Sequence, residues 1–340
     1  MIKIKNKITL FLLIIISISL VGCSKNDDKN QISETLNKVL LEKGAIVENE
    51  SGDYKNYSLT NSEYSWIENE DDEAIALYDY KSNNYIQLQN KKYYSVVNNK
   101  KKELTNIGMY DSNFNMSPGG KYLLFFRNKD YSQLNIMSLS SGKIIELKIN
   151  VSISGKYIDW LDENTIVYYG IRNEDKTNGI FTYNLKTGKE DIYLKLEEGY
   201  IEYIKALDDG VVYSVGNFNG EKKLIKITDK DKSSEILSTD IMKVYDLIEF
   251  EGKYYILGNF KNSDYALYCL SDGKYRRITY SFPSHIDLQK GLSTTDDGNI
   301  LFIGSNENGG ADSVYKADSN GAVSLVKSSD CEVNFVRRNS

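Results

Sequence analysis

A repeat of about 45 residues runs through most of this chain and limits what it can fold into. Turns precede the main apolar runs at Asp72, Pro118, Asp162, Asp208, Glu251 and Asp297. An asparagine follows these runs at Asn83, Asn128, Asn173, Asn217, Asn259 and Asn306. A third turn signal recurs at Gly52, Asn99, Gly142, Gly188, Asp231, Gly273 and Gly321. Three markers that keep one period are typical of propeller blades, which have four short strands each.

The composition between these markers is that of strands and tight turns. The chain has only 2 prolines in 340 residues, and short Tyr-, Ile- and Val-rich runs alternate with Gly, Asn and Asp clusters. In the second repeat this pattern predicts strands at residues 113–116, 121–126, 134–139 and 143–149. We therefore predict an all-β fold, a single β-propeller of six or seven four-stranded blades.

The two chain ends decide the number of blades. Residues 45–48 and 54–59 have the pattern of strands c and d without a preceding strand a, and residues 331–337 have the pattern of a strand a without a successor. Together they would complete a mixed blade, which favours seven blades over a six-blade ring with loose ends. Residues 32–43 have helical spacing and are interpreted as a lead-in helix, or as the missing strand b.

One repeat resembles a known family. Ser117-Pro118-Gly119-Gly120-Lys121 and the apolar run after it are similar to the SPDGK-type repeat of TolB-like and related WD40-like propellers, with Gly119 in place of the usual aspartate. The turns Ser141-Gly142-Lys143 and Thr187-Gly188-Lys189 resemble that family's c–d turns. The resemblance covers roughly residues 60–330 and implies an architecture only, because propellers host many unrelated functions.

The N-terminus predicts where the protein is located. Three lysines precede an apolar stretch of about fifteen residues, which fits a secretory signal better than a membrane span of roughly 20. Leu20-Val21-Gly22-Cys23 resembles the lipobox of bacterial lipoproteins, which implies that Cys23 carries a diacylglycerol. We thus expect a signal peptide at 1–22, the lipidated Cys23 with a polar tether and lead-in at 23–43, and the propeller at 44–340, exported and anchored to the outer face of the cell membrane.

Charge and cysteine content exclude several partners. The formal charge is −6, and removal of the three signal lysines takes it to −9. An acidic body argues against nucleic acid and against adsorption to anionic lipid. Beyond Cys23 only Cys269 and Cys331 remain, either bridged or free, and His285 is the single histidine. We therefore expect no zinc site, no other metal and no cofactor.

Motifs for enzymatic chemistry are missing from the sequence. It contains neither the G-x-S-x-G of hydrolases nor a phosphate-binding G-x-x-x-x-G-K-[ST]. His285 is interpreted as a loop histidine. Thr294-Thr295-Asp296-Asp297-Gly298 resembles a sialidase Asp box, but Leu301 stands where that box needs an aromatic residue. Asp159, Lys205 and Asp246 fall in innermost strands of successive blades, where they would line the channel or form an ion pair.

The b–c loops are the best candidates for a binding site. Aromatic side chains in polar loops suit contact with protein or sugar, and these loops carry Tyr131, Phe218 and Phe260. Arg127 and Arg172 occupy equivalent places before two successive loops and would grip an anionic group or cap the strand ends. We predict a binding or scaffold module for an envelope protein, peptide or glycan. The alternative is a carboxylate-dependent enzyme that acts on envelope carbohydrate.

Overall fold

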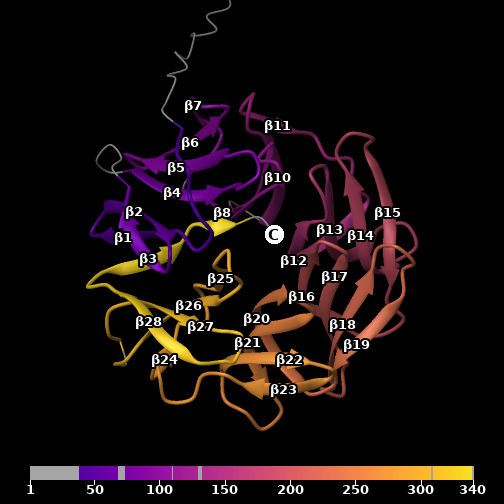
Figure 1. The fold of residues 1–340 in the computed structure, drawn as a ribbon. Coiled ribbons are helices and arrows are strands. Elements are labelled where there is room, and N and C mark those ends of the chain that lie inside the picture. Colours follow the sequence, from indigo (N-terminus) through magenta and orange to yellow (C-terminus); the bar gives the residue numbers. More distant parts are fainter. Residues whose placement is uncertain (1–37, 68–72, 109, 129–131, 308, 339–340) are drawn as a thin grey trace, which may run out of the picture. The chain divides into compact units, whose positions relative to one another are not determined.

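The computed structural model of the protein describes residues 38–338 except 68–72, 109, 129–131 and 308. In these residues 30 strands and no helix are present. The strands form seven sheets that follow one another in a ring (Figure 1). The innermost strands surround a cavity, which we name the central channel. The predicted all-β propeller is therefore confirmed, with seven blades rather than six.

Each blade orders its strands from the innermost, a, to the outermost, d. The blade nearest the N-terminus contains β29 (Glu332–Phe335), β1 (Ile46–Glu50), β2 (Asp53–Thr60) and β3 (Glu63–Trp66). The next contains β4 (Glu73–Tyr78), β5 (Tyr85–Gln89), β6 (Lys92–Val97) and β7 (Lys100–Glu103). The third contains β8 (Asp111–Met116), β9 (Tyr122–Asn128), β10 (Ser132–Ser138) and β11 (Lys143–Ile145).

The remaining four blades repeat this order. They are β12 (Val151–Trp160), β13 (Thr165–Arg172), β14 (Asn178–Asn184) and β15 (Lys189–Lys195); then β16 (Tyr200–Leu207), β17 (Gly210–Gly216), β18 (Lys222–Thr228) and β19 (Ser234–Ser238). The sixth is β20 (Ile241–Phe250), β21 (Lys253–Phe260), β22 (Ala266–Ser271) and β23 (Lys274–Arg277). The last has β24 (His285–Ile286) and β25 (Leu292–Thr294) as its inner segments, then β26 (Ile300–Ser305), β27 (Ser313–Ala317) and β28 (Val323–Ser328).

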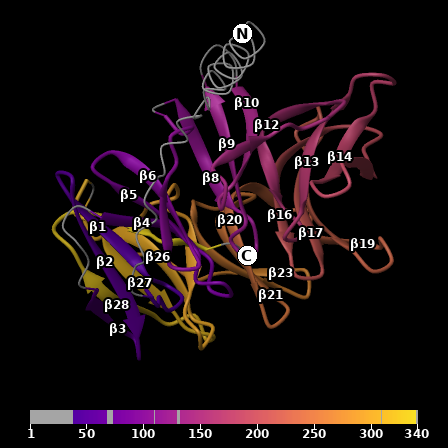
Figure 2. The same ribbon diagram turned by 90° about the horizontal axis from the view of Figure 1, so that it is seen from above.

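The ring closes through strands from both ends of the chain, as predicted. β29 pairs antiparallel with β1 from Ile46↔Phe335 to Asn49↔Glu332. Figure 2 shows this N-terminal blade beside β26–β28. β30 (Arg337–Arg338) continues past the closure and pairs in parallel with β4.

The strand assignments at the N-terminus were wrong by one position. The strands predicted as c and d are b and c, and β3 is the true strand d. Asn83 lies in an a–b turn and Gly52 in a b–c turn, so these two markers lie at different places in the blade from the other markers of their series. Asp72 lies outside the described residues. The predicted lead-in helix is absent from residues 38–43, which are irregular, and residues 32–37 lie outside the described residues.

Apolar clusters join each blade to the next. Seven such clusters are found among the described residues, and each draws its side chains from two neighbouring blades. One example packs Val212 and Leu224 of one blade against Ile256 and Tyr268 of the next. A single sheet leaves its faces in water, and stacking in a ring buries them.

Polar side chains connect the same blades. An Asp or Asn side chain of one blade accepts a backbone N–H of the next at several junctions: Asn56 from Ile75, Asp79 from Gly119, Asp159 from Ala206, Asp246 from Leu292 and Asp312 from Val333. Side chains make the two remaining junctions, Asn115 to Asp159 and Lys205 to Asp246. These bonds satisfy backbone groups that β-sheet pairing inside a blade leaves open.

The alternation of strands gives the propeller two unlike faces. Because neighbouring strands are antiparallel, the b–c and d–a connections share one face, which we name the loop face. The a–b and c–d turns share the opposite face, which we name the turn face. Each face surrounds one end of the central channel.

Candidate functional site

The channel contains the main cavity found among the described residues. Its volume is about 940 Å³, and the innermost strands β8, β12, β16 and β20 supply much of its wall. A cavity of this size in the centre of the ring is the default place to look for a ligand.

β-bulges shape the wall of this cavity. The register shifts in the innermost strands of five successive blades, once each in β4, β8, β12 and β16 and twice in β20. A bulge inserts a residue without a partner and re-aims its side chain. Five such residues line the cavity: Asn113, Phe114, Tyr157, Glu202 and Tyr245.

The bulge residues are held by neighbours on the loop-face side. The Tyr245 ring meets Tyr265 edge-on, with 5.7 Å between centroids. The Tyr157 ring lies 6.4 Å from that of Tyr169. Burial raises the pKa of Tyr157, and the nearby Glu202 carboxylate raises it further. Glu202 itself forms an ion pair of 2.6 Å with Lys222. This part of the cavity wall therefore contains the packed rings of Tyr157 and Tyr245 and one ion pair, between Glu202 and Lys222.

Deeper in the channel, Asp159, Lys205 and Asp246 all line the cavity, and Lys205 also forms an ion pair with Asp246, so both sequence interpretations apply. Lys205 Nζ lies 2.9 Å from Asp246 Oδ1, and both side chains are largely buried. Asp159 Oδ1 accepts hydrogen bonds from Asn115 Nδ2 and from the Trp160 amide. Burial raises the pKa of Asp159, an effect that Lys205 and these hydrogen bonds oppose. The carboxylates are thus committed to bonds between blades.

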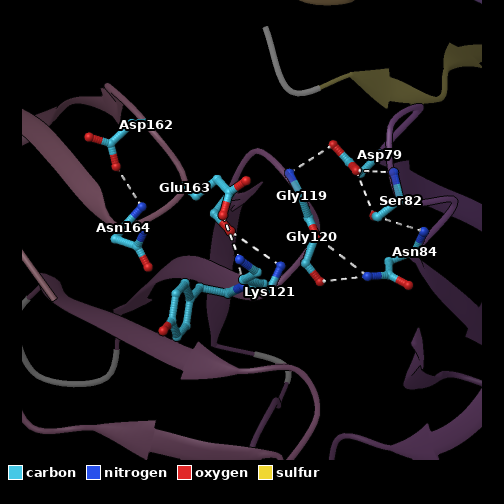
Figure 3. Close-up of polar contacts among 11 residues, drawn as sticks. Asp79, Ser82, Asn84, Gly119, Gly120, Lys121, Asp162, Glu163 and Asn164 are labelled. Atoms are coloured by element: carbon cyan, nitrogen blue, oxygen red, sulfur yellow. Dashed lines mark hydrogen bonds and ion pairs between the residues drawn. The ribbon is translucent and has the colours of Figure 1, made fainter. Parts of the chain in front are cut away.

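The turn face holds the motif that resembles TolB-like repeats. In Figure 3, the Gly119 amide donates to Asp79 of the preceding blade, at 3.1 Å, and the Asn84 amide donates to the Gly120 carbonyl. Gly120 has a φ of +61°, and a Cβ there would lie 2.6 Å from the Cβ of Asn84. Lys121 pairs with Glu163 of the following blade. The motif therefore links three blades, which is a structural role.

The two predicted arginines lie at the loop face, each bound within its own blade. Arg127 makes a bidentate contact to Asp111, with 2.8 Å from Nε to Oδ1 and 2.9 Å from Nη2 to Oδ2. Arg172 contacts Asp175 at 3.4 Å and stacks over the ring of Phe181. The guanidinium of Arg127 is occupied, so the proposed grip on an anion requires displacement of Asp111.

The three predicted aromatic residues have different environments. Phe218 is 90 % exposed and its ring lies 6.1 Å from that of Tyr200. Phe260 is 0 % exposed and stacks on Tyr275 with 4.0 Å between centroids. The assignment of Phe260 to an exposed loop was wrong, because β21 extends to include it. Tyr131 lies outside the described residues.

Exposed aromatic side chains gather on the loop face. Besides Phe218, the b–c and d–a connections carry Tyr280, Tyr110, Tyr265 and Phe282, which are 68, 56, 51 and 43 % exposed. Tyr280 also lies over the guanidinium of Arg277, at 5.3 Å. Trp66, which is exposed as well, lies at mid-height on an outermost strand, where it pairs with Tyr57.

Other predicted features appear where the structure describes them. His285, interpreted from the sequence as a loop residue, is instead an exposed residue of the two-residue strand β24. Cys269 and Cys331 are free thiols. Groups of three or more His, Cys, Asp or Glu side chains suited to a metal ion are not found among the described residues. Nor does the described part of the chain hold a helix of the length and apolarity that a bilayer crossing requires.

Comparison with known proteins relates the chain to propellers. No protein-family model matches the sequence, and no curated protein matches it. Similar solved structures include the β-propeller domain of the Trilobed protease from Pyrococcus furiosus, 14 % identical over 85 % of this chain and 95 % of that one, with a TM-score of 0.54. That domain is described as having an open velcro topology, whereas in this chain β29 closes the ring.

Two further structures are an acylaminoacyl peptidase and TolB from Acinetobacter baumannii. The peptidase is 12 % identical over 84 % of this chain and 52 % of that one, with a TM-score of 0.50. TolB is 11 % identical over 87 % of this chain and 79 % of that one, with a TM-score of 0.47. This chain spans about half of the peptidase. At such identities the similarity concerns the propeller fold alone.

Proposed function

We propose that this protein is an exported, lipid-anchored binding module of the TolB-like propeller type, which presents its loop face to an envelope protein, peptide or glycan. The anchor is inferred from the sequence, because Cys23 and the signal lie outside the described residues. The polar tether after Cys23 would let the propeller stand off the membrane.

The observation that carries this proposal is the concentration of exposed aromatic side chains on one face. Phe218, Tyr280 and Tyr265 extend from connections rather than from the blades' apolar interfaces. Rigid aromatic side chains with polar neighbours are enriched in recognition surfaces, since they bury large areas and lose little conformational entropy. In the described residues the turn face carries no exposed aromatic side chain of this kind.

A crosslinking pull-down from intact cells tests this role. We expect wild-type protein to capture a reproducible partner and the double variant Phe218→Ala/Tyr280→Ala to lose it. The matched control is Ile192→Ala, which removes a 41 % exposed side chain from the outermost strand β15. Equal capture by the wild type and the double variant would contradict a binding role for the loop face.

The lipid anchor has a separate test. Replacement of Cys23 by Ala removes the sulfur that would carry the diacylglycerol, so the variant should leave the membrane fraction. Tight membrane association of Cys23→Ala would refute the anchor and would leave the binding role untouched.

An enzyme that acts on envelope carbohydrate is the second candidate. It is favoured by Asp159, a channel carboxyl whose pKa burial raises, as a general acid requires. Against it, Asp159 and Asp246 already accept hydrogen bonds or an ion pair on both oxygens. Release of reducing ends from envelope glycan by wild-type protein, abolished in Asp159→Asn, would establish the enzyme.

A further inference from the structure

Lys243 differs from the other lysines in the wall of the channel. Lys205 pairs with Asp246, and Lys290 pairs with Glu332 at 2.7 Å. Lys243 is half-buried and lines the same cavity, but no ion pair or hydrogen bond of its side chain is found within the described residues. A partly desolvated charge without a partner costs free energy, and a bound anion would offset that cost.

The position of Lys243 places this charge near the loop face. It pairs with Asn259, close to the end of β21 from which the b–c loop begins. The bulges of β20 lie on either side of it, at Ile241/Lys243 and Val244/Asp246. The one carboxylate among the cavity's bulge residues, Glu202, is already neutralised by Lys222. Four further carboxylates of the lining lie at or next to a–b turns, toward the turn face: Asp208, Asp209, Glu249 and Glu251. At the loop-face end, Lys243 therefore adds a positive charge that no described carboxylate pairs.

Aromatic rings and amides surround the same end of the cavity. Tyr157 and Tyr245 line it from the strands β12 and β20, each backed by a second tyrosine ring. Asn113 and Gln289 add exposed amides that donate and accept hydrogen bonds. Flat rings beside amides suit the mixed apolar and hydroxyl surface of a sugar, and the lysine adds a preference for an acidic group.

We propose that the loop-face mouth of the channel binds a saccharide that carries an anionic group, with Lys243 as its charged anchor and Tyr157 and Tyr245 as its stacking surfaces. This inference rests on the proposed binding role and specifies its ligand class. The acidic body of the protein disfavours non-specific adsorption of polyanions, so binding must depend on this site.

The test measures binding of matched saccharides to the purified full chain by calorimetry. Hyaluronan and galacturonate tetrasaccharides and a phosphorylated oligosaccharide supply carboxylate and phosphate, and chitotetraose is the neutral counterpart. We expect at least one acidic saccharide to bind about tenfold or more tightly than chitotetraose, and added salt to weaken it. Lys243→Gln should weaken it by about ten- to a hundredfold, whereas Lys243→Arg keeps most of the affinity.

Two controls keep the result specific. Lys230→Gln removes an exposed lysine from a c–d turn on the turn face and should leave the affinity for the saccharide unchanged. Tyr245→Phe should retain stacking, and Tyr245→Ala should lose it. Because Lys243→Gln removes only a half-buried charge without a partner among the described residues, its melting temperature should equal or exceed that of wild type.

Three results would overturn the proposal. They are no binding of any acidic saccharide, equal affinity in wild type and Lys243→Gln, and tighter binding of a glutamate-rich peptide that the saccharide does not displace. If partner capture from cells still depends on Phe218 and Tyr280 in that case, the binding role stands and only the ligand class is wrong.

Discussion

Two phenylalanines that occupy similar places in the sequence should respond in opposite ways to truncation. Phe260 is fully buried and stacks on Tyr275 at 4.0 Å and meets Tyr268 at 5.0 Å. Removal of such a side chain typically costs about 3–5 kcal/mol, of which the lost ring contacts contribute roughly 0.5–1.5 kcal/mol per pair. Phe218 is 90 % exposed, so Phe218→Ala should change stability by less than about 0.5 kcal/mol.

Thermal unfolding followed by circular dichroism measures this difference. For a domain of this size, each kcal/mol lowers the melting temperature by roughly 2 °C, so Phe260→Ala should unfold about 6–10 °C below wild type. Phe218→Ala should unfold within about 1 °C of wild type while it loses partner capture. A melting temperature for Phe260→Ala equal to that of wild type would show that Phe260 is not in the core, and the distinction between the two residues would fail.

Three further predictions concern charged and titratable groups in the blades. Asp246→Ala should cost about 1–3 kcal/mol in urea unfolding, because it removes the ion pair with Lys205 and leaves the Leu292 amide without its acceptor. An unchanged midpoint would show that these bonds add nothing. Burial raises the pKa of Tyr85 and Tyr213 to about 12, so the unfolded chain loses these protons at a lower pH than the folded protein does. The free energy of unfolding should therefore fall as the pH rises from 10 through 12. This fall should be less steep in Tyr85→Phe. Burial raises the pKa of Asp159 above 3.8, so the native state binds that proton more tightly than the unfolded chain does. The contribution of Asp159 to the free energy of unfolding should therefore decline as the pH rises above 3.8. Asp159→Asn should not show this decline, and curves of stability against pH that run parallel in wild type and variant would contradict the prediction.

The sequence predicted the blades well because their physical basis is periodic. Tight turns and short apolar runs recur wherever a four-stranded unit must stack on its neighbours, and that recurrence is visible without a structure. The mixed closing blade was predicted for the same reason, since Glu332–Phe335 lacks a following partner in its own repeat and pairs with β1.

The identity of individual strands could not be predicted at the N-terminus. Strands a to d carry similar apolar patterns, so only the order of turns distinguishes them. The N-terminal blade begins at its second strand, and the a–b turn of the following blade, near Asn83, lies only 35 residues before that at Pro118. The markers Gly52 and Asn83 therefore keep the period of about 45 residues but lie next to different strands of the blade from the later markers of their series.

The site was harder to predict than the fold, since bulges decide which side chains reach the channel. Tyr157, Glu202 and Tyr245 were missed because an extra residue in a strand has no fixed composition. Lys243 was missed because the bulges on either side of it decide where it lies in the channel wall. One signal was present. Ser154 and Gly155 interrupt the apolar pattern of β12 beside Tyr157. Phe260 was misplaced because no local pattern shows where β21 ends.

The wall of the channel separates the residues that hold the ring from those available to a ligand. Asp159 and Asp246 are acidic and central, the features expected of catalytic groups, but their oxygens accept bonds from neighbouring blades. Loss of either should therefore loosen the ring before it affects any ligand. Lys243 has the opposite character, a half-buried charge whose side chain bonds to none of the described residues. A half-buried charge without such bonds is better explained by what it binds than by what it supports. The ligand hypothesis therefore depends on Lys243 rather than on the two aspartates.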